Sequence, residues 1–247
     1  MDLALLRAPG ARMLRVGHRG ARGHAPENTM ASFALGADMG VDAVETDVQL
    51  SKDGEVVLIH DHTVDRTTDG RGFVRDMTLA ELRRLDAGSW YDPGFAGERI
   101  PTLAELLVWA GDRVGVAIEI KNGPIYYPGI AEKTVRLVRQ QGMERRVILI
   151  SFDHLVLREA KTIAPEIATG ILYVGGLVDP VGAARAALAD SLNPNWAHIT
   201  PELVRAAHAA GLAISAWNPD DLATLRMLSD MGVDSAGTDY PELFAQV

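Results

Sequence analysis

Carboxylates and cationic side chains recur at the ends of predicted strands, at spacings that suit metal and phosphate binding. Residues i and i+2 of a strand point to the same face, so Glu45 should lie beside Asp47, and Glu119 beside Lys121. Carboxylate oxygens bind hard divalent cations, and the chain has no cysteine to favour a softer metal. These residues therefore predict a site for one divalent cation, Mg²⁺ or Ca²⁺, with Mn²⁺ as a third candidate.

Two histidines near such a metal suit acid–base chemistry on a phosphate ester. His18 ends the first predicted strand and His60 ends a later one, so one imidazole could take a proton while the other gives one. Arg19 and Lys121 could bind phosphate oxygens and stabilise the charge of the transition state. Two structural alternatives remain: hydrogen-bonded histidines without a catalytic role, and a buried ion-pair network between the carboxylates and the two cations.

Short β-branched segments alternate with Ala- and Leu-rich segments along the chain. The predicted strands are 14–18, 43–48, 115–121, 147–151, 167–173, 190–193, 212–217 and 234–238. The predicted helices are 27–39, 102–110, 129–141, 153–163, 180–188, 200–210, 219–231 and 240–246. Strict alternation predicts a parallel sheet with right-handed crossovers, and 247 residues suit one α/β barrel of the (β/α)8 kind. A doubly wound open sheet is the alternative, although a Gly-rich loop after the first strand is missing.

A ninth strand candidate, 56–60, follows too closely for a helical crossover. The turn signal Lys52-Asp53-Gly54 predicts a hairpin with 43–50 that passes the barrel rim and brings His60 back to the mouth. Residues 61–100 have no place in the repeat. We therefore expect a single domain over 1–247, with a small insertion after the second strand that lies over the catalytic end.

Composition excludes several classes of protein. With 33 acidic and 24 basic residues the net charge is −9, which argues against a nucleic-acid partner. A hydrophobic content of 47% excludes a disordered chain, and the apolar runs are too short to span a membrane. The acidic Asp2 and the lack of a long apolar segment argue against a signal peptide. We expect a cytoplasmic monomer or homodimer without stable membrane insertion; periplasmic export is a minor alternative.

A set of motifs, in order and over nearly the whole chain, resembles the glycerophosphodiester phosphodiesterase family. The motifs are His18-Arg19-Gly20, Ala25-Pro26-Glu27-Asn28-Thr29, Glu45-x-Asp47-Val48, Lys52-Asp53-Gly54, His60-Asp61, Arg66-Thr67-Thr68-Asp69-Gly70-x-Gly72, Ile100-Pro101-Thr102-Leu103-x-Glu105, Glu119-Ile120-Lys121 and Thr238-Asp239-Tyr240-Pro241. The resemblance implies a TIM barrel and metal-dependent hydrolysis of small glycerophosphodiesters to glycerol 3-phosphate and an alcohol.

The resemblance also implies roles for individual residues. The metal ligands are expected to be Glu45, Asp47 and Glu119, the acid–base pair His18 and His60, and the phosphate-binding cations Arg19 and Lys121. The implied route runs through a cyclic phosphate formed by the glycerol 2-hydroxyl. It favours His18 as base and His60 as acid in the first step, and the sequence alone leaves the reverse order open.

Some positions keep more than one interpretation. The family often has Trp-Thr-Val-Asn after the seventh strand, whereas this chain has Ser215-Ala216-Trp217-Asn218, so Trp217 is either a substrate contact or barrel packing. Asp239 could orient a histidine, orient Lys121 or cap a helix. Two other functions stay open: a phospholipase D-like activity on lysophospholipids, and a catalytically silent barrel that binds phosphodiesters.

Overall fold

The structure is a computed structural model that describes residues 12–247. The prediction that the chain has no signal peptide concerns the N-terminal segment, which lies outside these residues. Within 12–247, every helix is too short or too polar to cross a bilayer.

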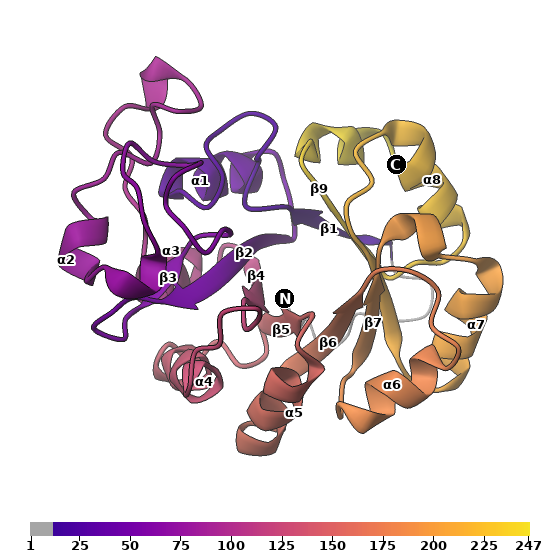
Figure 1. Cartoon of the computed structure of the whole chain (residues 1–247). Coiled ribbons are helices and arrows are strands. Elements are labelled where there is room, and N and C mark those ends of the chain that lie inside the picture. The colour runs from indigo at the N-terminus through magenta and orange to yellow at the C-terminus, as the bar shows by residue number, and fades with distance from the viewer. Residues whose placement is uncertain (1–11) are drawn as a thin grey trace.

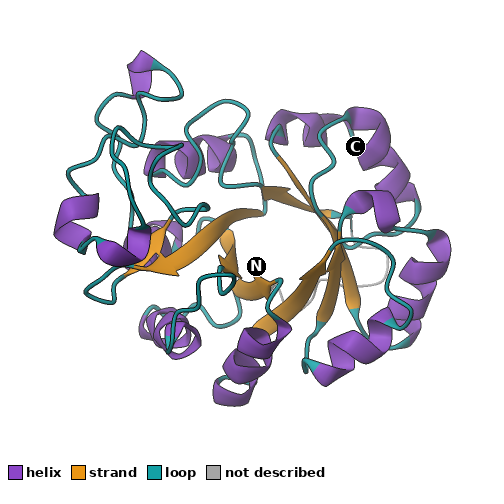
Figure 2. Cartoon of the chain, in the orientation of Figure 1, coloured by secondary structure: helices purple, strands orange, loops and turns teal. Residues whose placement is uncertain are grey.

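Eight parallel strands form a barrel with helices around its outside (Figures 1 and 2). β1 pairs with β9 on one side and with β2 on the other, which closes the ring. The predicted (β/α)8 barrel is therefore confirmed. Its strands are β1 (Leu14–Gly17), β2 (Ala43–Leu50), β4 (Gly115–Ile120), β5 (Val147–Ser151), β6 (Ala168–Tyr173), β7 (Ser191–Pro194), β8 (Ala213–Ala216) and β9 (Ser235–Thr238).

The helices follow the predicted order, and most boundaries lie within a few residues of the prediction. They are α1 (Met30–Asp38), α3 (Leu103–Ala110), α4 (Ile130–Gln140), α5 (His154–Ile163), α6 (Pro180–Ala186), α7 (Pro201–Ala209), α8 (Leu222–Asp230) and η5 (Pro241–Gln246). Asp153 and Thr200 cap α5 and α7 as predicted, each accepting a backbone N–H bond.

Two helix predictions are corrected. The predicted helix 27–39 begins only at Met30, because Asn28 has a left-handed φ of 57° and Thr29 is the N-cap. The predicted helix 240–246 is the 3₁₀ helix η5, the tighter form that short segments adopt.

The predicted hairpin is also present. β3 (Val56–Leu58) runs antiparallel to the end of β2, with Val48 opposite Leu58. Gly54, at a φ of 81°, allows the tight turn between the two strands. The Ile59 N–H donates to the Asp47 carbonyl at 3.0 Å, so His60 returns to the level of Asp47.

The insertion after β3 contains the short helices η2 (Val74–Asp76), α2 (Leu79–Leu82) and η3 (Pro93–Phe95). Figure 1 shows it beside β3 and α1, at the left of the view. The Tyr91 hydroxyl donates to the Gly23 carbonyl at 2.8 Å, and Arg66 pairs with Glu27. The insertion therefore borders the barrel mouth next to the loop that follows β1. It has its own apolar cluster, formed by Val57, Ile59, Val64, Val74, Leu82, Ala87 and Ile100.

Candidate active site

Three buried carboxylates meet at the carboxyl ends of two adjacent strands. Glu45 and Asp47 project from β2, and Glu119 from β4, where it is the register partner of Asp47. Each offers an oxygen within 4.8 Å of the others, and each residue is at most 8% exposed. The prediction that Glu45 and Asp47 share one face is confirmed by this geometry.

Two cations accompany the carboxylates. Lys121 Nζ lies 2.6 Å from Glu119 Oε1 and 3.0 Å from Asp47 Oδ1. Arg19 Nε lies 3.2 Å from Asp47 Oδ2, and the Arg19 backbone N–H donates to Glu45 Oε2 at 2.9 Å. The ion pairs expected for a buried ion-pair network are therefore present. Within the described residues, however, neither the Lys121 ammonium nor the Arg19 guanidinium pairs directly with Glu45.

The negative charge of this cluster is incompletely balanced. Burial raises the pKa of Glu45 well above its usual range, and the neighbouring Asp47 charge raises it further. Burial also raises the pKa of Glu119, against the opposing effect of Lys121. Asp47 Oδ1 is buried, and its cationic neighbour, Lys121 Nζ at 3.0 Å, is shared with Glu119. A hard divalent cation fits this donor set, because it would supply the missing positive charge to oxygen ligands.

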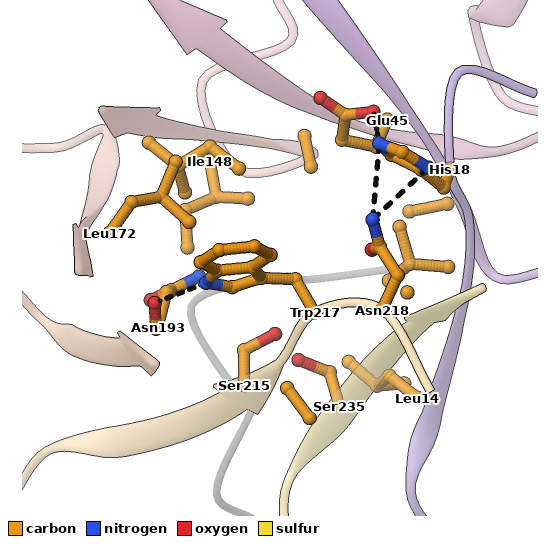
Figure 3. Close-up of a pocket in the computed structure, with 16 residues that line it drawn as sticks. Leu14, His18, Glu45, Ile148, Leu172, Asn193, Ser215, Trp217, Asn218 and Ser235 are labelled. Carbon is orange, nitrogen blue, oxygen red and sulfur yellow. Dashed lines mark hydrogen bonds and ion pairs between the residues drawn. The ribbon is translucent and has the colours of Figure 1, made fainter. Parts of the chain in front are cut away.

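His18, directly after β1, lies beside Glu45. Its Nδ1 is 2.5 Å from Asp239 Oδ1, and its Nε2 is 3.9 Å from Glu45 Oε2. The Asn218 amide nitrogen lies 3.1 and 3.2 Å from the two ring nitrogens (Figure 3). Burial lowers the pKa of His18, against the opposing effect of Asp239. Of the three roles considered for Asp239, the structure agrees with the first, because the carboxylate lies next to a histidine.

His60 has a parallel arrangement on the hairpin. Its Nδ1 lies 2.7 Å from Asp61 Oδ1, while its side chain is 33% exposed. Burial lowers the pKa of His60, and the Asp47 charge opposes that shift. Each histidine therefore has Nδ1 held by an aspartate, and Nε2 of His18 additionally lies beside the Asn218 amide.

A second layer of charge supports Arg19. Glu27 Oε1 accepts from Arg19 Nη1 at 2.8 Å, and Arg66 of the insertion donates two bonds to the same carboxylate at 2.9 and 2.7 Å. Asn28 donates to Asp47 Oδ2 at 2.8 Å. The left-handed backbone of Asn28, after which α1 begins, thus places the Asn28 side-chain amide against the carboxylate cluster. Sequence analysis identified Glu27 and Asn28 as motif residues, but their hydrogen-bond partners could be identified only from the structure.

Replacing Glu27 with Gln is expected to destabilise the protein by about 3 kcal/mol at pH 7, the usual size for breaking a buried ion pair. Burial opposes ionisation of Glu27, but Arg66 and Arg19 lower its pKa from 4.5 to about 2. The stabilisation is thus complete above pH 4.5 and lost as pH falls to about 2. Urea unfolding at several pH values should show the gap between wild type and variant narrowing across this window.

An exposed acid provides the comparison for Glu27. Glu159→Gln, on the exposed face of α5, should change the free energy of unfolding little. A gap for Glu27→Gln that stays constant from pH 7 to pH 2 would show that the carboxylate charge is not what stabilises this layer.

Below His18, a small cavity of about 60 Å³ extends into the barrel interior (Figure 3). Its wall is mainly apolar, with Ile148 and Leu172 facing Trp217. Trp217 Nε1 donates to the Asn193 carbonyl at 2.8 Å, and the indole meets the Phe152 ring edge-on at 5.5 Å. Trp217 is therefore fixed by packing and also faces the cavity next to His18, so both interpretations of this residue fit its position.

Comparison with known proteins places the chain among phosphodiesterases. Residues 18–243 match the model of the glycerophosphoryl diester phosphodiesterase family. A glycerophosphodiester phosphodiesterase from Caldanaerobacter subterraneus subsp. tengcongensis is 46% identical over 230 residues, which cover 93% of this chain and 95% of the relative.

Solved structures agree with the sequence matches. A glycerophosphodiester phosphodiesterase from Agrobacterium tumefaciens is 36% identical, with a TM-score of 0.85 over 95% of this chain and 100% of the other. A phosphodiesterase from Oleispira antarctica, solved in complex with the product sn-glycerol-3-phosphate, is 31% identical, with a TM-score of 0.86 over 95% of this chain and 96% of the other.

Proposed function

The chain belongs to the glycerophosphoryl diester phosphodiesterase family of phosphoric diester hydrolases, and from this premise we propose that it hydrolyses glycerophosphodiesters to glycerol 3-phosphate and an alcohol. The observation that carries the proposal is the pair of aspartate-held histidines beside one buried carboxylate cluster. Hydrolysis of a phosphodiester needs a group that takes a proton, a group that gives one and positive charge on the phosphate oxygens. This site can supply all three.

His18 is proposed as the first base. Asp239 accepts from Nδ1, which leaves Nε2 as the acceptor for the proton of the glycerol 2-hydroxyl. Burial lowers the pKa of His18, which favours the neutral ring that can accept a proton. The hydroxyl oxygen bonds to phosphorus as the bond to the head-group oxygen breaks, which forms a cyclic phosphate.

His60 is proposed as the acid of the same step. For this role His60 must be an imidazolium, with the Nδ1 proton held by Asp61 and the Asp47 charge opposing the effect of burial on its pKa; the proton on Nε2 can then pass to the departing alcohol oxygen. Water then opens the cyclic phosphate, with the two histidines in reversed roles. Arg19 and Lys121 are proposed to offset the charge of the phosphate oxygens.

The carboxylates Glu45, Asp47 and Glu119 are proposed to hold the divalent cation, and Mg²⁺, Ca²⁺ and Mn²⁺ all suit these oxygen ligands. When bound, this cation would act as a Lewis acid toward the phosphate. Its charge would also relieve the repulsion between the three buried carboxylates.

Hydrolysis of lysophospholipids is a second candidate, favoured by one specific observation. Apolar side chains are exposed after β5 and β6, which end at the barrel mouth; they are Phe152, Leu155, Val174, Leu177 and Val178. Such side chains could contact the acyl chain of a lysophospholipid.

The test is release of glycerol 3-phosphate by purified, metal-stripped protein. The substrates are glycerophosphocholine, glycerophosphoethanolamine and glycerophosphoglycerol, each with Mg²⁺, Ca²⁺ or Mn²⁺ added back. We expect metal-dependent release from at least one of them. A parallel lysophosphatidylcholine arm, scored as lysophosphatidic acid, tests the second candidate. Activity in neither arm with any metal would reject both.

A further inference from the structure

A larger pocket opens on the His60 side of the carboxylate cluster, away from the apolar cavity. Its volume is about 350 Å³, and it lies between the ends of β3, β4 and β5. His60 and Asp61 form one wall, and Asn122, Phe152 and Asp153 line it from the other two strand ends. An alcohol leaving the phosphate could occupy this space, because it is open and offers polar side chains such as Asn122 and Asp153 beside the apolar Phe152.

Gln49 fixes the backbone that carries His60. It is fully buried at the end of β2 and lies two residues beyond Asp47, on the same face of the strand. Its Nε2 lies 3.0, 3.0 and 2.7 Å from the carbonyl oxygens of Ile59, His60 and Asp61, which share its two N–H donors. One side-chain amide thus holds three consecutive peptide groups around the proposed acid.

The same amide is itself held from the loop after β4. The Tyr127 hydroxyl donates to Gln49 Oε1 at 2.7 Å. The Tyr127 N–H donates to Asn122 Oδ1 at 2.8 Å, and Asn122 Nδ2 donates to Asp153 Oδ2 at 2.7 Å. Hydrogen bonds therefore link His60 to the other walls of the pocket. This network contains none of the residues expected to bind metal or phosphate.

We propose that Gln49 is the positioning residue of His60, and that the pocket lined by His60 receives the leaving alcohol. The inference rests on the proposed function. Asp61 fixes the rotation of the imidazole through Nδ1, whereas Gln49 fixes the main chain from which the ring projects. Both constraints are needed to hold Nε2 within reach of the alcohol oxygen, since proton donation requires hydrogen-bond distance.

The test compares two substrates that differ in their need for a proton. Glycerophosphoethanolamine must gain a proton at the leaving oxygen, whereas the p-nitrophenyl ester of glycerol 3-phosphate releases a stable phenolate. Single-turnover release of the alcohol, with enzyme in excess, isolates the step in which His60 acts as the acid. Gln49→Met is expected to slow release of ethanolamine by about 10–10²-fold, the usual cost of a misplaced catalytic group. Release of p-nitrophenolate should stay close to the wild-type rate, and substrate binding should change little.

Milder variants guard against a general loss of structure. Tyr127→Phe removes one bond of the network and should show the same substrate pattern, with a smaller loss. Tyr173→Phe is the matched control, because the buried Tyr173 hydroxyl has no hydrogen-bond partner among residues 12–247. It should leave both rates unchanged. The folded fraction of each variant is checked by circular dichroism at the assay temperature.

Each outcome decides the inference. A defect restricted to the substrate that needs a proton supports it. Equal losses on the two substrates, or full activity of folded Gln49→Met on both, would overturn the positioning role while leaving the proposed function in place. If wild-type protein releases alcohol from neither ester, the proposed function fails and the inference fails with it.

Discussion

Replacing His18 with Ala is expected to lower the rate of glycerol 3-phosphate release by about 10²–10⁴-fold, the usual contribution of a positioned acid or base. The ring is buried, burial lowers its pKa, and Asp239 accepts at Nδ1, so Nε2 is the nitrogen proposed to accept the proton. Without it, the proposed acceptor for the proton of the glycerol 2-hydroxyl is lost. Steady-state kinetics with the preferred glycerophosphodiester measure the loss, which should fall mainly on kcat.

A second histidine variant separates the base from the acid. His60→Ala should cause a loss of similar size on ordinary substrates, but a p-nitrophenyl leaving group should restore its rate of alcohol release. The same leaving group should not rescue His18→Ala, because attack by the hydroxyl still needs a base. If the p-nitrophenyl leaving group restored the rate of His18→Ala but not of His60→Ala, His18 would be the acid and His60 the base.

An unrelated histidine provides the control. His198→Ala, in the exposed η4 (Trp196–His198), should retain full activity. Wild-type rates in both His18→Ala and His60→Ala would contradict acid–base catalysis by these residues.

Much of the barrel could be predicted from periodicity and chain length, because each βα unit has a local signal. The spacing of two residues was enough to place Glu45 and Asp47 on one face. Register between strands was not predictable in this way. Asp47 meets Glu119 only because β2 and β4 pair in one particular alignment, which depends on packing of the whole sheet.

The partners of His18 show where sequence reasoning ends. Asp239 and Asn218 follow β9 and β8, about two hundred residues further along the chain. They reach His18 because β1 pairs with β9 when the barrel closes. Asp239 was one of several open interpretations, and the contact between Asn218 and His18 was not predicted. Closure of the barrel brings together residues whose contact cannot be predicted from the local sequence around either one.

The late start of α1 has a similar cause. Helix propensity alone extends the helix back to residue 27, yet the Asn28 side chain accepts from Thr46 and donates to Asp47. Asn is one of the few residues that adopt a left-handed conformation at low cost. A contact across the fold therefore outweighs one turn of helix.

Removing the divalent cation is expected to abolish activity and to lower the thermal stability of the folded protein. Within residues 12–247, the three buried carboxylates pair with two cations, Lys121 and Arg19, so a bound metal ion should stabilise the folded state by mass action. Calorimetry of stripped protein with increasing Mg²⁺, Ca²⁺ or Mn²⁺ should show a rising melting temperature. Activity measured in parallel should return over the same concentration range.

Glu119→Gln connects this effect to a single oxygen ligand. The amide keeps the shape of the side chain but loses the charge, so the metal titration should shift to higher concentration by about tenfold or more, as expected for disturbing a ligand set. Glu132→Gln, on the exposed first turn of α4, is the matched control and should leave the titration unchanged. Because the melting temperature reports binding without turnover, it separates a weakened site from a damaged catalyst. An unchanged titration for Glu119→Gln would remove Glu119 from the ligand set and leave its role to the ion pair with Lys121.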